Sequence, residues 1–388
     1  MINFSMTRWL EASEALQALR VRPQTLYAYV SRGRIRAEAH PDDPRRSRYD
    51  AADIDSLATR KARGRKRADV AADAIAWGEP VLASAITTVA GGRLYYRGHD
   101  AAQLAESETF EGVARLLRGV DGQPRRTAHR RPPPEDADAR GRLFAAMAAE
   151  ASRSSGAGAR SPAELGCEAA SLLDVACDAV CGVIGAGPIH ERLALAWGCS
   201  EAGRDLIRRA LVLLADHELN ASTFAARVAA STGASLAACA LAGLAALSGP
   251  LHGGASESVI RLAAEAERLS PREAVAARLA HWSRSPGFGH PLYPDGDPRA
   301  RALLGAFAAP APYPDLMAEM EAATGARDNV DFAIAALSRS LALPPEAPFL
   351  LFAVARTAGW TAHAIEQASS GTLIRPRARY IGPDPGPA

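Results

Sequence analysis

The sequence predicts an all-α protein, and two features of its pattern support this. Ala and Leu fill most of the apolar positions, while aromatic residues make up only 6% of the chain, a balance that favours helices over strands. From Glu164 onward helical periodicity continues almost without a break, except at Gly/Pro clusters in 185–188, 249–254, 286–298 and 371–376. At 388 residues the chain is long enough for two or three domains.

The first predicted domain covers residues 1–62. Its expected elements, in order, are a helix over Glu14–Leu19, a second helix from Pro23 to Val30, a stop at Gly33, an Arg-rich hairpin over 34–49, and a third helix capped by Asp50 and containing Ile54 and Leu57. A basic linker, 63–80, follows and includes most of the run "KARGRKR".

The segments "VRPQTLYAYVSRGRIRAE" and "RRSRYDAADIDSL" resemble winged helix-turn-helix modules of the MerR and excisionase type. Residues 1–68 carry fifteen Lys/Arg and eight Asp/Glu, a net charge of +7, so the remaining 320 residues have a net charge of −5. A small basic segment of this kind suggests nucleic acid as a partner. The resemblance implies base contacts by Gln24, Thr25 and Tyr27, whereas the alternative is a small helical domain whose arginines are solvated.

Two features separate this domain from the helical body. The segment 85–97 predicts a short hairpin that turns at Gly91-Gly92. Between 119 and 161, Pro-, Gly- and Ser-rich stretches predict exposed loops around one short helix, Leu143–Ala151.

The cysteine pattern argues against a metal site. Five cysteines are widely spread and show no spacing typical of metal ligands, so free thiols in a reducing cytoplasm are expected, with no metal and no cofactor. No run of 18 uncharged apolar residues occurs, and the first ten residues lack the apolar core of a signal peptide. The chain is therefore expected to be cytoplasmic and to have no membrane partner.

Four candidate site residues lie next to the breaks in the helical pattern. His217 lies in "ADHELNASTF", His252 in "GPLHGGASE", His290 in "GFGHPLYPDGDPRA", and Asp331 begins the helix of "NVDFAIAAL". Glycines next to a loop histidine free its backbone, and such freedom suits a site more than a core. A single loop histidine is still more often structural, but four motifs together indicate a shared site.

These motifs, with "FAVARTAGWTAHAIEQ" and "RPRARYIG", resemble citrate synthases in order and approximate spacing over about residues 80–382. The resemblance implies a large helical domain, 81–253 and 343–382, and a smaller domain, 254–342, that closes over the substrates. It also implies a homodimer.

The resemblance assigns a role to each residue. Asp331 is the base that removes a proton from the acetyl methyl group, His252 donates to the enol oxygen, and His290 donates to the 2-oxo carbonyl. His252 is expected to stay neutral because of the dipole of the helix that follows it. Oxaloacetate is a dianion, and arginine grips carboxylates with parallel donors. The matched carboxylate-binding positions are Arg299, Arg356 and Arg375, the last reaching across the dimer, and His217 is a further contact.

The implied activity is condensation of acetyl-CoA with oxaloacetate in the tricarboxylic acid cycle, with acetyl-CoA as a substrate rather than a cofactor. One alternative is 2-methylcitrate synthase, which uses propionyl-CoA, because one methylene changes discrimination by only about 1–3 kcal/mol. Another is a regulator that senses a metabolite through this body and reads DNA through residues 1–62. Pro291 and Leu292 depart from the family, which commonly has a basic residue after the histidine, so one contact to CoA phosphate is in question.

Overall fold

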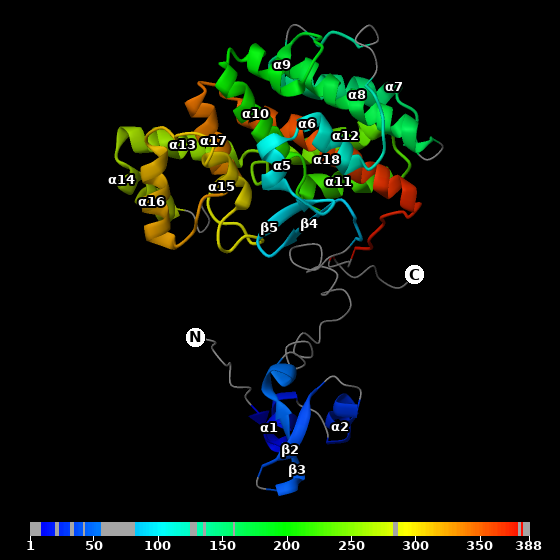
Figure 1. Cartoon of the computed structure of the whole chain (residues 1–388), viewed down its shortest axis with the longest axis vertical. Helices are drawn as coiled ribbons and strands as arrows, with labels where there is room; N and C mark the ends of the chain where they lie inside the picture. The colour runs from blue at the N-terminus through cyan, green and yellow to red at the C-terminus, as the bar shows by residue number, and fades with distance from the viewer. Residues whose placement is uncertain are drawn as a thin grey trace. The chain divides into compact units, whose positions relative to one another are not determined.

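The computed structural model describes residues 9–19, 23–31, 35–41, 43–55, 82–124, 130–134, 137–157, 160–281, 286–378 and 382. The chain divides into two compact units, Met1–Ala83 with Arg377–Ala388, and Ser84–Pro376 (Figure 1). The division falls just beyond the predicted basic linker, whose residues lie outside the described ranges.

The first unit combines two helices with a small antiparallel sheet. Its elements are β1 Trp9–Leu10, α1 Ala12–Leu19, α2 Pro23–Ser31, β2 Ala37–His40 and β3 Asp43–Asp50, with helical residues at 51–55. The strand order is β1-β3-β2. Helices, hairpin and third helix thus occur where the sequence predicts them, although the winged helix-turn-helix identity stays a prediction; Gly33 and Leu57 lie outside the described residues.

Local chemistry explains how this unit holds together. Asp50 Oδ1 accepts hydrogen bonds from the backbone N–H groups of Ala52 and Asp53, which caps the helix after β3. A small core of buried side chains lies between the helices and the sheet, and includes Leu19, Leu26, Ile35 and Tyr49. The unit therefore has its own core.

The second unit begins with the hairpin that the sequence predicts. Strands β4 Thr87–Ala90 and β5 Arg93–Tyr96 pair antiparallel around Gly91-Gly92, both of which have positive φ, and β6 His99–Asp100 adds a third strand. The rest of the unit is helical. Its helices are α5 Ala101–Ser107, α6 Phe110–Arg118, α7 Ala139–Arg153, α8 Pro162–Cys181, α9 Ile189–Ala196, α10 Glu201–Leu214, α11 Ala221–Ser231, α12 Leu236–Leu247, α13 Ala255–Arg268, α14 Pro271–His281, α15 Pro298–Leu304, α16 Tyr313–Thr324, α17 Val330–Ser340 and α18 Ala347–Ser370.

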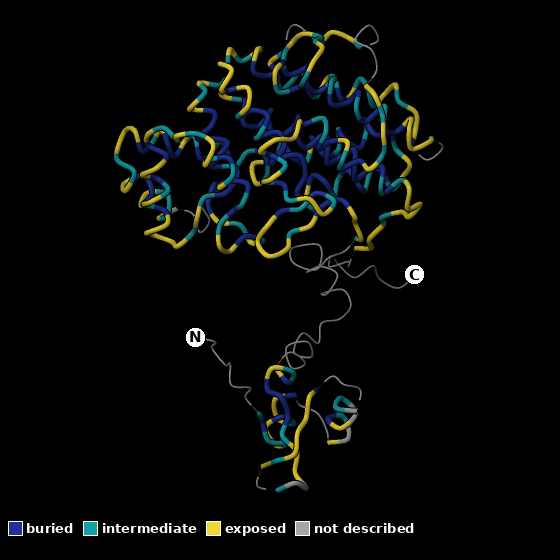
Figure 2. The backbone as a smooth tube through the Cα atoms, in the orientation of Figure 1, coloured by how far each residue is buried: buried dark blue, intermediate teal, exposed yellow. Residues whose placement is uncertain are grey.

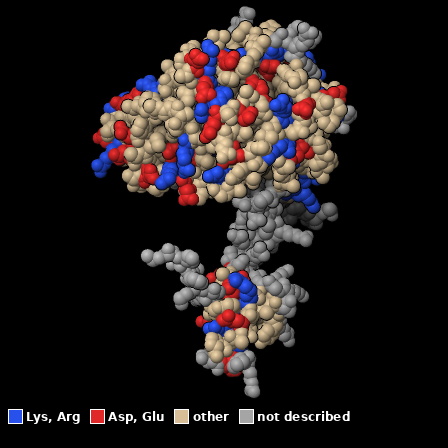
Figure 3. All heavy atoms as spheres, in the orientation of Figure 1, with Lys and Arg blue, Asp and Glu red and all other residues tan. Residues whose placement is uncertain are grey.

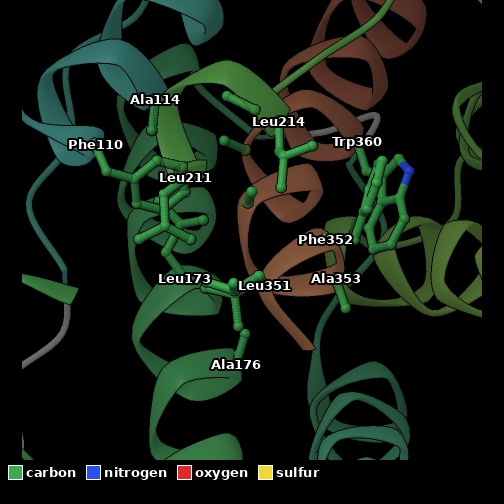
Figure 4. Packing of buried hydrophobic residues seen from close by; sticks show 14 of the residues in the cluster. Phe110, Ala114, Leu173, Ala176, Leu211, Leu214, Leu351, Phe352, Ala353 and Trp360 are labelled. Carbon is green, nitrogen blue, oxygen red and sulfur yellow. The ribbon is translucent and has the colours of Figure 1, made fainter. Parts of the chain in front are cut away.

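Helix α18 forms the centre of the larger core. It packs against α6, α8, α10, α11 and α12, and nearly all of its residues are buried, as the dark tube in Figure 2 shows. A helix that is apolar on every side is expected only in such a surrounded position. Figure 4 shows part of this packing, formed by Phe110 and Ala114 of α6, Leu173 and Ala176 of α8, Leu211 and Leu214 of α10, and Leu351, Phe352, Ala353 and Trp360 of α18.

A second, smaller core joins α13, α14, α16 and α17 at one side of the unit (Figure 1). Phe332 of α17 packs against Phe288 and Tyr313 there, with ring centroids 5.0 Å and 5.4 Å apart. Helix α17 also contributes Val330, Ala333 and Ile334 to the larger core. A single helix thus links the two cores, and Asp331 lies at its start.

The mostly helical fold predicted from the sequence is confirmed. One boundary differs, since α7 spans Ala139–Arg153 and is longer than the predicted Leu143–Ala151 because Asp138 caps it earlier. The five cysteines are free thiols. No helix in the described parts of the chain is long and apolar enough to cross a membrane, and no group of three or more His, Cys, Asp or Glu side chains there could hold a metal ion.

Candidate active site

Six of the seven predicted active-site residues gather where α11, α13, α15, α17 and α18 begin or pass one another. His252 lies in the turn before α13. The N–H of Gly253 donates to Leu247 O, and a Cβ on Gly253 would lie only 2.6 Å from that oxygen. Only glycine fits this approach, so the sequence "HGG" is required by the turn that presents His252.

His290 is held by a loop that is tied to the start of α17. Gly287 and Gly289 both have positive φ, a conformation in which glycine is favoured. Gly289 N–H donates to Arg327 O, and Asn329 N–H donates to Gly287 O. Loop and helix start are therefore one rigid piece, which fixes His290 relative to Asp331.

Hydrogen bonding defines the protonation of His290. The backbone N–H of Leu292 donates to Nδ1 of His290 over 3.2 Å, so Nδ1 is an acceptor and the proton of the neutral ring is on Nε2. Burial, together with the charge of Arg299, lowers the pKa of His290 to about 4. At neutral pH this ring is an uncharged donor through Nε2.

His217 lies beside His290, with ring centroids 5.0 Å apart in an edge-on arrangement. Its Nε2 is 2.9 Å from the hydroxyl of Tyr293. Burial first, then the charge of Arg299, lowers the pKa of His217 well below its usual range. This histidine is also neutral.

His252 is part of a network centred on Ser222. The Oγ of Ser222 lies 2.9 Å from His252 Nε2 and 2.7 Å from Asn220 Oδ1, and accepts from the indole N–H of Trp360 over 3.1 Å. Burial, then the charge of Arg356, lowers the pKa of His252 to about 4. The ring is neutral as expected, and burial and a nearby cation both favour this; the contribution of the helix dipole stays a prediction.

Asp331 is the half-buried carboxylate to which the sequence assigns the base. It is the second residue of α17, and its Oδ1 accepts a 2.9 Å hydrogen bond from Ser256 Oγ. Burial raises the pKa of Asp331 to about 6, against the opposing hydrogen bond from Ser256. A carboxylate with this pKa is ionised at neutral pH and is a stronger base than an exposed aspartate.

The two buried arginines of the site differ in how they are paired. Arg299 grips Asp297 through two parallel hydrogen bonds, Nε to Oδ1 at 3.0 Å and Nη2 to Oδ2 at 2.7 Å. Arg356 donates from Nε to Leu214 O over 2.9 Å. Its Nη1 is buried and has no hydrogen-bond partner within the described structure. Arg356 therefore has a buried donor that no described residue accepts.

Arg375 is not brought to this site by the single chain. It is exposed, beyond the end of α18, in a segment without helix or strand. Its predicted role across a dimer remains a prediction.

A pocket of about 230 Å³ opens beside His290. Its wall is formed by His290 and Tyr293, by Asp297, and by the loop from Thr324 to Asp328. Arg327 belongs to this wall.

The sequence reading missed several residues that support the site, namely Asp216, Ser222, Ser256, Tyr293 and Asp297. Each lies inside a motif that the sequence displays, so a search for polar neighbours within those motifs would have found them.

Ion pairs neutralise several arginines of the predicted nucleic-acid surface. Arg36 pairs with Asp50 and Asp53, Arg46 with Glu11, and Arg48 with Glu38. Thr25 and the exposed Tyr27 lie in the first turns of α2, while the side chain of Gln24 lies outside the described residues. On the larger unit, the face in Figure 3 shows both charge signs interspersed.

Comparison with known proteins places this geometry in a family context. A model of the citrate synthase C-terminal domain matches residues 183–377. Citrate synthase 2 of Bacillus subtilis is 38% identical over 191 residues, 46% of this chain and 51% of that protein. A 2-methylcitrate synthase of Shewanella oneidensis is 35% identical over 187 residues, 45% of this chain and 50% of that protein. The chain thus aligns with about half the length of these curated relatives. The crystal structure of citrate synthase from Thermotoga maritima superposes with a TM-score of 0.64 at 29% identity, covering 80% of this chain and 96% of that one.

Proposed function

This chain belongs to the citrate synthase family, and we propose that it condenses acetyl-CoA with oxaloacetate and hydrolyses the thioester to release citrate and CoA. The observation that carries the proposal is Asp331, whose raised pKa suits a base, within one site that also holds two neutral histidines and two buried arginines.

Asp331 is the proposed base for the first step. It takes a proton from the acetyl methyl group, and the electron pair moves onto the thioester oxygen to form an enolate, which a hydrogen bond from His252 stabilises. Burial raises its basicity, and Ser256 holds one carboxylate oxygen so that the other is free to face the substrate.

His252 is the proposed donor to that enol oxygen. In the structure the Ser222 hydroxyl donates to Asn220 Oδ1 over 2.7 Å, and His252 Nε2 lies 2.9 Å from the same Ser222 oxygen. Asn220 Oδ1 also accepts the backbone N–H groups of Ser222 and Thr223. The proposed step requires the Ser222 proton to turn to His252 Nε2 when the acyl-CoA binds, which puts the ring proton on Nδ1, where it stabilises charge developing on the thioester oxygen.

His290 is the proposed donor to the 2-oxo carbonyl. Its Nδ1 accepts from Leu292, so the proton of the neutral ring is on Nε2, which is the proposed donor. Polarising that carbonyl prepares it for attack by the enol carbon, which forms the new carbon–carbon bond. Water then cleaves the thioester, and CoA leaves as the thiol.

The carboxylates of oxaloacetate are assigned to Arg356 and Arg299, with His217 as a further contact. The unused Nη1 of Arg356 supports this, since a buried guanidinium without a partner is stabilised by an incoming carboxylate. The acyl-CoA is assigned to the pocket beside His290. Arg327 on its wall supplies a cation, although it is paired with Glu321 over 3.2 Å.

The decisive test is release of free thiol by purified protein with oxaloacetate and either acetyl-CoA or propionyl-CoA. Higher kcat/KM for acetyl-CoA supports the proposal, and a higher value for propionyl-CoA assigns a 2-methylcitrate synthase instead. That second activity is considered because a relative of that name matches almost as well. Failure with both thioesters, despite bound oxaloacetate, would point to the sensing regulator.

We further propose that two copies form a homodimer in the cytoplasm, in which Arg375 of each completes the site of the other. Co-expression of an Arg375→Ala chain with an Asp331→Asn chain tests this, because a shared site restores activity in one of the two sites of a mixed dimer. Absence of any restored activity, with mixed dimers shown by mass spectrometry, would contradict it.

DNA contact through residues 1–62 is a separate proposal, based on the order of α1, α2 and the β2–β3 hairpin. The ion pairs of Arg36, Arg46 and Arg48 reduce the number of cations free for phosphate. Anisotropy titration of the full chain against mixed duplex fragments tests it, with log affinity falling by roughly 0.9 per phosphate contact against log salt. No binding at low salt would leave the unit without this role.

A further inference from the structure

Asp216 is a fully buried carboxylate that no role in the proposed reaction uses. It directly precedes His217, and its Oδ2 lies 3.2 Å from Nε2 of His363 on α18. Its Oδ1 has no hydrogen-bond partner within the described structure. Burying an ionisable group in this way is unfavourable unless nearby charges compensate it.

The proton on His363 can be assigned from its two neighbours. Arg227 of α11 places Nη1 3.2 Å from His363 Nδ1, and a guanidinium only donates. His363 Nδ1 is therefore the acceptor, and Nε2–H donates to Asp216. Arg227 is held in place by Glu366 and Gln367, one α18 turn beyond His363.

The backbone of α18 makes room for this carboxylate. Gly359 lies inside the helix, where glycine is less favourable than alanine by about 1 kcal/mol. A Cβ on Gly359 would lie 2.3 Å from Asp216 Oδ1 and 2.6 Å from Ala215 O. The N–H of Gly359 donates to that same carbonyl. The missing side chain at 359 thus allows Asp216 to sit against the helix face that carries Arg356.

Arg356 is the charge that Asp216 offsets. Arg299 already has a partner in Asp297, whereas no ion pair joins Arg356 to any carboxylate in the described structure within 4.0 Å. Burial lowers the pKa of Arg356, and Asp216 is the foremost charge that opposes this. Burial likewise raises the pKa of Asp216, but His363 and Arg356 outweigh it and hold this pKa below its ordinary value.

We propose that Asp216 and His363 are positioning residues that set the affinity of the site for the dianionic substrate. Asp216 is the resident counter-ion of Arg356, close enough to balance its charge and too far to occupy its donors. His363 holds Asp216 in place and ionised. This inference rests on the proposed function, since it concerns how the same site binds oxaloacetate.

The sign of the effect follows from the charges. With Asp216 neutral, the free protein holds an uncompensated buried cation, and a bound dianion relieves it. Substrate binding then becomes tighter while the free protein becomes less stable. A role in folding alone would lower stability without changing affinity.

The first experiment measures oxaloacetate binding by calorimetry in an Asp331→Asn background, which removes turnover and the titration of Asp331. Asp216→Asn keeps the shape and the acceptor for His363, and we expect its Kd for oxaloacetate to fall by about tenfold or more, as expected for one nearby unit charge at an effective dielectric constant of ~20. An unchanged or higher Kd for oxaloacetate overturns the inference. If the protein with Asp331→Asn alone does not bind oxaloacetate, the proposed function itself is contradicted.

The second experiment uses His363 and decides the matter if Asp216→Asn does not fold. The groups that face Asp216 are Arg356 and His363 from α18, Thr87 from β4, and Tyr96 from β5, with His217 next to it in the chain. His363→Leu removes the donor, so Asp216 takes up a proton at higher pH and the Kd for oxaloacetate falls as pH is lowered from 8 to 5. His363→Gln keeps a donor near Nε2 and should show little change. Identical pH dependence in both variants overturns the inference.

Discussion

Ser256 Oγ donates a 2.9 Å hydrogen bond to Asp331 Oδ1, so the second residue of α13 holds the second residue of α17. The two helices belong to the smaller core, while His252 immediately precedes α13. The start of α13 therefore positions both the proposed base, Asp331, and the proposed enol donor, His252. A small change in this contact should therefore affect kcat more than substrate affinity.

Ser256→Ala should move the acid limb of the pH profile upward. The hydrogen bond favours the ionised form of Asp331, so its loss raises the pKa of Asp331 above about 6, by about one unit for a bond to a charged group. Since the ionised form is the active base, kcat/KM for acetyl-CoA falls at a higher pH than in the unsubstituted protein. The histidines, with pKa values near 4, do not titrate in this range. If the acid limb of the pH profile does not move, the ionisation of Asp331 does not control it.

Asp331→Asn should abolish thiol release and leave oxaloacetate binding largely intact. Removing a general base lowers rates by about 10²–10⁴, and the dianion is held by arginines rather than by this carboxylate. Thiol release and calorimetry on the same preparation separate the two effects. Retained turnover would mean that another group is the base.

Ser222→Ala should lower kcat more than it changes KM for oxaloacetate. Without the hydroxyl, His252 Nε2 loses its hydrogen-bond partner, and nothing directs the ring proton to the nitrogen that faces the thioester oxygen. The loss of one donor to a developing oxyanion is worth about 10²–10³ in kcat. Ser222→Thr, which keeps a hydroxyl, is the matched control. Equal loss in both variants would indicate a packing defect.

Arg356 and Arg299 should differ when each is replaced. Arg356→Gln removes an arginine that has no direct ion pair and leaves Asp216 hydrogen-bonded to His363, so the apparent KM for oxaloacetate should rise strongly while the free energy of unfolding falls less than in Arg299→Leu. Arg299→Leu strands Asp297, which also accepts the N–H of Val330, and this should lower the free energy of unfolding by about 3–5 kcal/mol. Urea denaturation beside steady-state kinetics makes the comparison. Equal stability of the two variants would contradict the stabilising role of the Arg299–Asp297 ion pair.

Deleting residues 1–83 should leave an active protein. Every described residue assigned to chemistry or substrate lies at or after Asp216, and the first unit has its own core. Thiol release and sedimentation of the truncated chain provide the test. An insoluble or inactive product would show that the first unit is part of the catalytic body.

The sequence by itself determined the helical class and the order of the site residues. The Ala/Leu-rich pattern requires helices, and glycines mark where they stop, so the positions of His217, His252, His290 and Asp331 at helix ends could be predicted. The hairpin at Gly91-Gly92 was equally visible because only a turn explains two adjacent glycines between short apolar runs. These are local properties, encoded within a few residues of each position.

Only the tertiary structure decided which partners these residues have. Asp216 meets His363 across 147 positions and Trp360 meets Ser222 across 138, contacts that local patterns do not encode. Burial of the site explains why His252 is neutral and why Asp331 is a stronger base, and the packed helices around α18 produce that burial. The sequence predicts which residues carry the chemistry, while desolvation and long-range charge pairing, which depend on the whole fold, determine their protonation.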